Sequence, residues 1–105
     1  MATVSIVYPR QPGATFDYDY YQTQHMRLAG EHWGNAGLTG GEALIGKAAA
    51  DGSAPAFFAI GIIHFESDEA LQAALTGDHA AEVMGDIRNF TDVQPIIQVN
   101  ERVTP

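Results

Sequence analysis

Two histidines and a tyrosine repeat at helical spacing near the start of the chain, and these residue types could carry acid–base chemistry. His25 lies four residues after Tyr21, and His32 lies seven residues after His25, so all three share one face of an α-helix. An imidazole exchanges protons near neutral pH, and a phenol one turn away can orient it or donate a hydrogen bond to a substrate. The pattern favours His25 as an acid–base residue with Tyr21 as its partner. The alternative is a core histidine whose nitrogens are satisfied by neighbours.

The polar character of this face points to a small-molecule pocket. Burying an imidazole or a phenol costs free energy unless each polar atom finds a partner, so a core-facing polar stripe in a small protein needs a reason. Leu28 lies on the same face and, with His32, extends the expected pocket wall. Tyr8 at the end of a first strand and Trp33 at the end of the helix are further candidates for contact with a bound molecule. His64 alternates with apolar residues in a later strand, and the pattern leaves open which side it faces.

The spacing of the two histidines does not suit a shared metal ion. His25 and His32 stand two helical turns apart, about 10 Å along the axis, and no His-x-x-x-His pair or carboxylate–histidine triad lies nearby. The chain also lacks a Gly-x-Gly-x-x-Gly pattern and a phosphate-binding loop. We therefore expect neither a metal nor a cofactor, and haem held by a single histidine is left as an option.

A helix from Asp17 to about Gly34 is expected to present these residues. Asp17 is a good N-cap because its carboxylate can accept hydrogen bonds from the free amides of the first turn. Phe16 and Tyr21 have the spacing of a hydrophobic staple. Asp19 adds negative charge where the helix dipole favours it. Gly34 is the expected C′ residue at the end of the helix, and Gly30 is an alternative, earlier end.

The remaining elements complete a β-α-β-β-α-β order. A second helix begins after Ser67 and is interrupted near Gly77 and Asp78. Four strands are expected at 4–8, 38–48, 55–65 and 94–103. This order is ferredoxin-like, an α+β fold whose four-stranded antiparallel sheet carries two helices on one face. With 105 residues, the chain forms a single domain over 1–105.

The third strand is apolar on both faces, which predicts self-association. One face should carry Phe57, Ala59, Gly61, Ile63 and Phe65, and the other Phe58, Ile60 and Ile62. A strand that is apolar on both sides is covered on both sides, yet the two helices can cover only one face of the sheet. Covering a large apolar side chain is worth roughly 1.5–3 kcal/mol. We therefore expect a two-fold homodimer that covers the second face.

Composition narrows the range of partners. The chain has 46% hydrophobic and 17% charged residues and a formal charge of −8, so it should fold but should not bind phosphate backbones or anionic membranes. It contains no apolar run long enough to span a bilayer. The absence of cysteine excludes disulfides and thiol catalysis. Together with an N-terminus unlike a signal peptide, this favours a cytoplasmic protein that binds neither nucleic acid nor membrane.

Several short motifs resemble the EthD family of the dimeric α/β barrel superfamily. The first is an early Tyr-Pro strand end, followed by Phe-Asp-x-x-Tyr-Tyr-x-x-x-His over 16–25 and by His-Trp-Gly over 32–34. The later segment over 87–92, which contains Phe90, and the Gln-Pro that follows it are similar to the family's C-terminal segment. The likeness spans nearly the whole chain. The family is named for a protein linked to ethyl tert-butyl ether degradation.

The resemblance implies a dimer whose sheets close into a barrel, with a pocket between each subunit's sheet and its helices. His25 matches the family's helix histidine, and Tyr20 and Tyr21 match its aromatic pair. Many members carry proline where this chain has Arg27. Relatives on this fold include cofactor-free monooxygenases, isomerases and cyclases, and fold alone does not fix chemistry.

We therefore expect a small cofactor-independent enzyme that acts on a hydrophobic or aromatic small molecule. Isomerase, cyclase, dehydratase and monooxygenase chemistry all fit the residues of the expected site. His25 and Tyr21 are the expected catalytic residues, and substrate contacts are expected from Tyr8, Tyr20, Leu28, His32, Trp33, His64 and Phe90. The alternative is a non-catalytic binding or accessory protein of a degradation pathway, and a haem-binding protein is a third reading.

Overall fold

A four-stranded antiparallel sheet forms the centre of the protein. The computed structural model describes residues 2–103, and its strands pair in the order β2-β3-β1-β4. The strands are β1 (Ala2–Pro9), β2 (Leu38–Ile45), β3 (Phe57–Phe65) and β4 (Ile96–Asn100). The expected α+β fold with an antiparallel sheet is confirmed.

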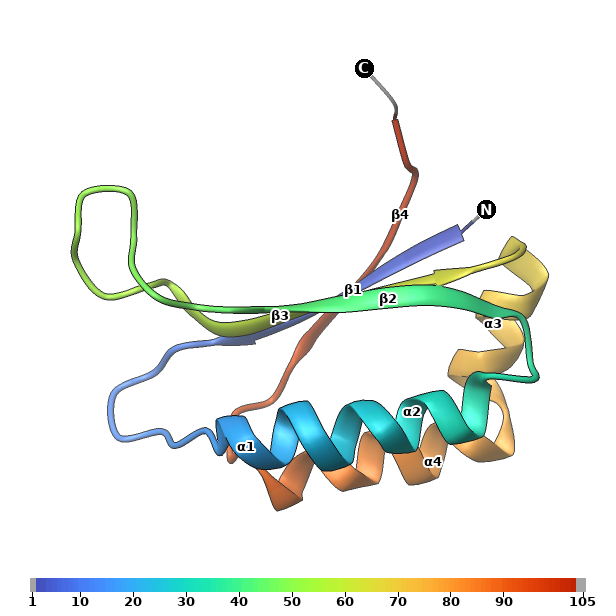
Figure 1. Ribbon diagram of the computed structural model, residues 1–105, viewed down its shortest axis with the longest axis horizontal. Helices are drawn as coiled ribbons and strands as arrows, with labels where there is room; N and C mark the ends of the chain where they lie inside the picture. Colours follow the sequence, from blue (N-terminus) through green and yellow to red (C-terminus); the bar gives the residue numbers. More distant parts are fainter. Residues whose placement is uncertain (1, 104–105) are drawn as a thin grey trace.

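All the helices lie on one face of the sheet (Figure 1). The first helical stretch consists of α1 (Tyr18–Tyr20), a π-helical turn η1 (Tyr21–His25) and α2 (Met26–Trp33). The second consists of α3 (Asp68–Thr76), α4 (Asp78–Gly85) and a 3₁₀ turn η2 (Asp86–Asn89). The interruption expected near Gly77 is confirmed, because α3 ends there and α4 starts afresh. The opposite face of the sheet carries no helix of the described chain (Figure 1).

Local chemistry fixes the start of each helical stretch. The Asp17 carboxylate accepts from the Tyr20 amide at 3.1 Å, and the rings of Phe16 and Tyr21 lie 5.2 Å apart, so the expected N-cap and hydrophobic staple are both present. The Ser67 hydroxyl likewise accepts from the Ala70 amide at 3.1 Å. Both helical stretches therefore begin at a side-chain cap that the sequence predicts.

The first helical stretch ends at Gly34 as expected, because α2 stops at Trp33 and Gly34 is its C-cap. Gly34 itself keeps right-handed helical geometry. Gly37 instead has the left-handed φ of 95°, which glycine adopts without steric strain. A Cβ at Gly37 would also lie only 2.7 Å from the Ala70 side chain. This turn brings the chain back against the start of α3 and into β2.

A register shift near the start of β3 exchanges two phenylalanines. The pairing of β1 with β3 shifts between Tyr8 and Pro9, so Phe58 faces the helices and Phe57 does not. The Phe58 ring stacks on Phe16 with centroids 5.5 Å apart and is 6% exposed, whereas Phe57 is 37% exposed. The expectation for these two residues was wrong because one extra residue in a strand reverses the alternation beyond it. Beyond the shift, the faces of β3 are as expected.

The helix-facing side of the sheet forms the hydrophobic core. Its fully buried large side chains come from strands and helices alike: Val4, Tyr8, Tyr21, Trp33, Phe65, Leu71 and Val83. Aromatic rings concentrate around Phe16 and Phe90, mostly in edge-to-face contacts, an arrangement that aromatic rings prefer. Between residues 2 and 103, no helix is long and apolar enough to cross a membrane.

Candidate functional site

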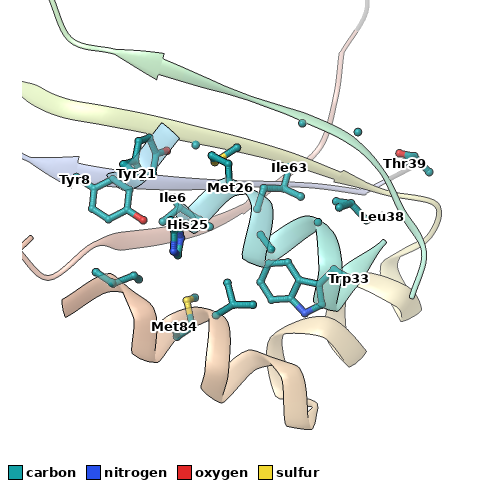
Figure 2. Close-up of a pocket in the computed structure, with 17 residues that line it drawn as sticks. Ile6, Tyr8, Tyr21, His25, Met26, Trp33, Leu38, Thr39, Ile63 and Met84 are labelled. Carbon is teal, nitrogen blue, oxygen red and sulfur yellow. The ribbon is translucent and has the colours of Figure 1, made fainter. Parts of the chain in front are cut away.

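A cavity of about 340 Å³ lies between the inner face of the sheet and the helices α2 and α4 (Figure 2). Its polar end is formed by Tyr8, Tyr21 and His25, and Trp33, Leu38 and Thr39 lie toward the other end (Figure 2). The complete wall consists of Ile6, Tyr8, Tyr21, His25, Met26, Ala29, Gly30, Trp33, Leu38, Thr39, Gly40, Gly41, Gly61, Ile63, Val83, Met84 and Ile87. The wall is predominantly apolar, as is usual for pockets that bind small organic molecules.

The π-helical turn decides which residues of the first helix reach this cavity. The prediction assumed α-helical periodicity and placed Leu28 and His32 on the face of Tyr21 and His25. A π turn closes hydrogen bonds over five residues rather than four, so the positions after η1 advance by one residue. Ala29 and Trp33 therefore occupy the cavity wall, and Leu28 and His32 do not.

His25 is held by a carboxylate from the other helical stretch. Its Nδ1 lies 3.0 Å from Oδ2 of Asp86, the first residue of η2. His25 is 5% exposed, and the Phe90 ring packs against the imidazole at 4.7 Å. His25 also stacks on Tyr21 at 5.9 Å. The imidazole orientation is thus fixed by a hydrogen bond at one edge and by rings on its faces.

Asp86 is itself fixed by two further donors. The Tyr20 hydroxyl donates to Oδ1 at 2.7 Å, and the Asn89 amide donates to the same oxygen at 2.9 Å. Burial opposes the charged form of Asp86, but the hydrogen bonds from Tyr20, Asn89 and His25 outweigh it and hold the pKa of the carboxyl below its usual range. Asp86 is therefore an anion at neutral pH, so His25 Nδ1 must be the donor in their hydrogen bond.

The second nitrogen of His25 is directed to the cavity. Nε2 has no hydrogen-bond partner among residues 2–103. This atom is not fully enclosed by the protein, and His25 lines the cavity. Burial lowers the pKa of His25, and the hydrogen bond and charge of Asp86 oppose that shift without cancelling it. The imidazole is therefore neutral at pH 7 and carries an available lone pair on Nε2.

Two phenols complete the polar end of the cavity. The Tyr8 and Tyr21 rings meet edge to face at 5.6 Å, and neither hydroxyl has a hydrogen-bond partner in the described chain. Burial raises the pKa of Tyr21 to about 12. Burial, reinforced by Tyr21 and Asp86, also raises the pKa of Tyr8. Gly61 leaves room for the Tyr21 hydroxyl against the sheet, because a Cβ there would lie 3.2 Å from it.

Of the expected substrate contacts, Tyr8 and Trp33 line the cavity. The others lie outside its wall: Tyr20, Leu28, His32, His64 and Phe90. Tyr20 and Phe90 support Asp86 and His25 from behind. His64 is on the outer face of the sheet, where Nδ1 lies 2.9 Å from the Thr3 hydroxyl; the alternation of β3 sends it away from Ile63 and the helices.

His32 joins α2 to α4 outside the cavity. Its Nδ1 lies 2.8 Å from His79 Nδ1, and its Nε2 lies 2.9 Å from Glu82. This trio serves as a contact between the two helices. In the part of the chain that the structure describes, no three histidine, aspartate or glutamate side chains are arranged to hold a metal ion.

Sequence reasoning missed Asp86 as a partner of His25. The two residues are 61 positions apart, and a carboxylate near the end of a helix is ordinarily a solvated surface group. The only local signal is the Asp-x-x-Asn spacing of Asp86 and Asn89, which places an amide beside a carboxylate one turn later. The apolar wall from Val83, Met84 and Ile87 was also missed.

The buried imidazole predicts a pH-dependent stability. Because the pKa of folded His25 lies below its ordinary value of 6.5, the unfolded chain binds a proton more readily than the folded protein. The free energy of unfolding should therefore fall as pH drops below about 6.5, until the pH reaches the pKa of folded His25. Urea unfolding between about pH 7 and pH 5 should show this fall, and a His25→Gln variant should show less of it. Equal pH dependence in the two proteins would contradict the prediction.

The four-stranded antiparallel sheet with its helices on one face defines an α+β protein with the fold of the dimeric α/β barrel proteins. The chain belongs to the EthD family. It is 36% identical to an EthD-like protein of Ralstonia eutropha JMP134, covering 98% of this chain and 92% of that one with a TM-score of 0.88. This confirms the resemblance on which the family was predicted.

Two more distant structures show the fold alone. An EthD family protein of Bacillus halodurans C-125 is 17% identical, with 98% of this chain and 99% of that chain covered and a TM-score of 0.77. An antibiotic biosynthesis monooxygenase is 11% identical, with 99% and 100% covered and a TM-score of 0.53. No protein-family model and no curated protein matches the chain.

Proposed function

We propose that this protein is a cofactor-independent enzyme that acts on a hydrophobic, aromatic small molecule by acid–base chemistry at His25. The observation that carries the proposal is a buried imidazole whose Nδ1 lies 3.0 Å from Oδ2 of Asp86 and whose Nε2 has no protein partner among residues 2–103, at the wall of an apolar cavity. Most buried polar groups that serve only packing are hydrogen-bonded, whereas Nε2 of His25 has no partner in the described chain. The EthD-like and monooxygenase-like relatives of the fold are consistent with a small-molecule enzyme.

The proposed step is proton transfer to and from His25 Nε2. Nδ1–H donates to the Asp86 carboxylate, which selects the tautomer whose lone pair lies on Nε2. When Nε2 takes a proton from the substrate, the imidazolium lies beside the Asp86 anion, which stabilises it. The proton can then return to another atom of the same molecule. Tyr21, one turn away on the cavity wall, orients the substrate or polarises its oxygen.

Hydrogen–deuterium exchange in an aromatic ketone tests this proposal without knowledge of the natural substrate. Removing a proton from carbon is a step shared by isomerisation, cyclisation and many dehydrations. 2-Tetralone is bicyclic and largely apolar, and its protons next to the carbonyl exchange with D₂O when a base removes them. We expect the protein to accelerate this exchange, as measured by proton NMR. A carrier would bind 2-tetralone, seen as a change in Trp33 fluorescence, without accelerating exchange, and that result would reject the enzyme.

We also propose that the protein is a homodimer joined through the outer face of the sheet. Leu44 and Ile96 are 48% and 58% exposed on that face. Two residues of the central strands lie between them, because Ile60 pairs with Leu44 and with Val7, and Val7 pairs with Ile96. Leaving these side chains in water forgoes roughly 1.5–3 kcal/mol for each one that could be covered. The fold class is one in which two sheets pack together.

Charge at the centre of this face is expected to separate the dimer. Ile60→Glu places a carboxylate in each half of the proposed interface, and burying it there without a partner is strongly unfavourable. Sedimentation velocity at micromolar concentration should show a dimer for the parent protein and a monomer for the variant. Gln72→Glu adds the same charge to the exposed side of α3 and should leave the dimer intact. A parent protein that sediments as a monomer would reject the interface.

A further inference from the structure

The polar atoms available to a ligand gather at one end of the cavity. The side chains of the cavity wall that carry a nitrogen or an oxygen are those of Tyr8, Tyr21, His25, Trp33 and Thr39. The Thr39 hydroxyl already donates to a backbone carbonyl at 3.2 Å, and the Trp33 indole nitrogen is fully enclosed. The Tyr8 and Tyr21 hydroxyls and Nε2 of His25 are therefore the polar groups left to a ligand, and their three side chains lie at the same end of an otherwise apolar space (Figure 2). We refer to these three side chains as the polar cluster.

The charges around this cluster exclude a permanently anionic ligand group. No lysine or arginine among residues 2–103 lines the cavity, and the Asp86 carboxylate lies directly behind His25. A carboxylate or phosphate placed there would lose its hydration without gaining a cation. The ligand must therefore enter with a neutral oxygen, and negative charge can appear on it only during the reaction.

The two phenols can only donate to such an oxygen. Both are protonated at neutral pH because burial raises the pKa of each. A neutral phenol directs its hydrogen toward an acceptor such as a carbonyl oxygen. Donors fixed in advance in an apolar cavity stabilise an oxygen most when it becomes an anion, since hydrogen bonds to charged acceptors are the stronger ones.

We propose that the site is built to form an enolate, so that its substrates are neutral aromatic ketones, or phenols that react through their keto forms. The proposal rests on the proposed function and narrows it: Tyr8 and Tyr21 form an oxyanion hole opposite the base His25. In the step, the C–H bond next to the carbonyl breaks and its proton forms an N–H bond at Nε2. The electron pair left behind forms a carbon–carbon double bond while the carbonyl π pair moves to the oxygen, which the two hydroxyls hold. Returning the proton to a different atom gives the tautomer.

A phenol that changes colour on ionisation reports on this arrangement directly. Bound 4-nitrophenol would give its proton to His25 Nε2, leaving an oxygen anion in the position of the enolate oxygen. At a pH where the free probe is mostly neutral, we expect the visible spectrum of the bound probe to be that of its anion. Tyr8→Phe and Tyr21→Phe should each lower the ratio of ionised to neutral bound probe about tenfold or more, and the double variant should lower it further.

Tyr18→Phe is the matched control for these variants. It removes a hydroxyl from the same helical stretch at a residue that does not line the cavity, so it should leave the ionised fraction unchanged. A bound probe that stays neutral, or ionisation that is unaffected by both cavity substitutions, would overturn the oxyanion hole, and so would a failure to bind. The 2-tetralone experiment tests the proposed function separately from the oxyanion hole. If exchange depends on His25 but not on the two tyrosines, the proposed function is supported and the oxyanion hole is rejected.

Discussion

Replacing His25 by alanine is expected to lower the rate of 2-tetralone exchange by about 10²–10⁴-fold, the range that a positioned acid–base group contributes. The reason is that no other base among residues 2–103 lines the cavity, so the carbonyl compound would still bind but its proton would have no acceptor. Proton NMR in D₂O measures the rate, and circular dichroism and sedimentation show whether the protein remains folded and assembled.

A companion variant separates chemistry from packing. His25→Gln keeps an amide donor for Asp86 and fills more of the space that alanine would vacate, but glutamine cannot take up a proton near neutral pH. Both variants should therefore lose exchange to a similar degree. His32→Gln removes a histidine that contacts His79 and Glu82 outside the cavity, and it should exchange as fast as the parent. Retained exchange in both His25 variants would remove this residue from the mechanism.

Features fixed by neighbouring residues could be predicted from the sequence. The N-caps Asp17 and Ser67, the Phe16–Tyr21 staple and the break near Gly77 all depend on groups within five positions of each other, and each is present as expected. The ferredoxin-like order followed because strand and helix patterns were strong. His25 and Tyr21 were placed on one helix face correctly because they precede the end of the π turn.

Features set by tertiary packing could not be predicted in this way. The π turn carries no distinctive residue, yet it moves Ala29 and Trp33 into positions that α-helical spacing gave to Leu28 and His32. The register shift beside Pro9 changes the side of the sheet that Phe58 faces. In both cases one extra residue in the local repeat changes the side to which the following side chains point. The pattern of hydrophobic residues in the sequence hardly differs from that of a regular helix or strand.

Asp86→Asn is expected to reverse the tautomer of His25. The Tyr20 hydroxyl and the Asn89 amide both donate to Oδ1 of Asp86, so in the variant they should retain the amide oxygen of the new asparagine. Its NH₂ group would then face His25 Nδ1, which would have to accept a hydrogen bond instead of donating one. The proton of the neutral ring would move to Nε2, where it blocks the lone pair that acts as the base.

The expected result is a loss of exchange of about 10²–10⁴-fold, comparable to the loss of the base itself. Nitrogen NMR of the imidazole should show the proton on Nδ1 in the parent and on Nε2 in the variant. Asp92→Asn removes a surface carboxylate that accepts from the Thr15 amide, and it should change neither the rate nor the tautomer.

The pH profile distinguishes this positioning role from a purely structural one. Exchange needs the neutral imidazole, so the rate should fall as pH drops through the pKa of His25. In the parent, burial lowers this pKa and Asp86 partly restores it. Removing the carboxylate charge should therefore lower the pKa of His25 further and move the acidic limb of the profile to lower pH. If Asp86→Asn only made the protein less stable, the tautomer of His25 and the position of the acidic limb would both stay as in the parent. That outcome would show that Asp86 supports the fold without directing the base.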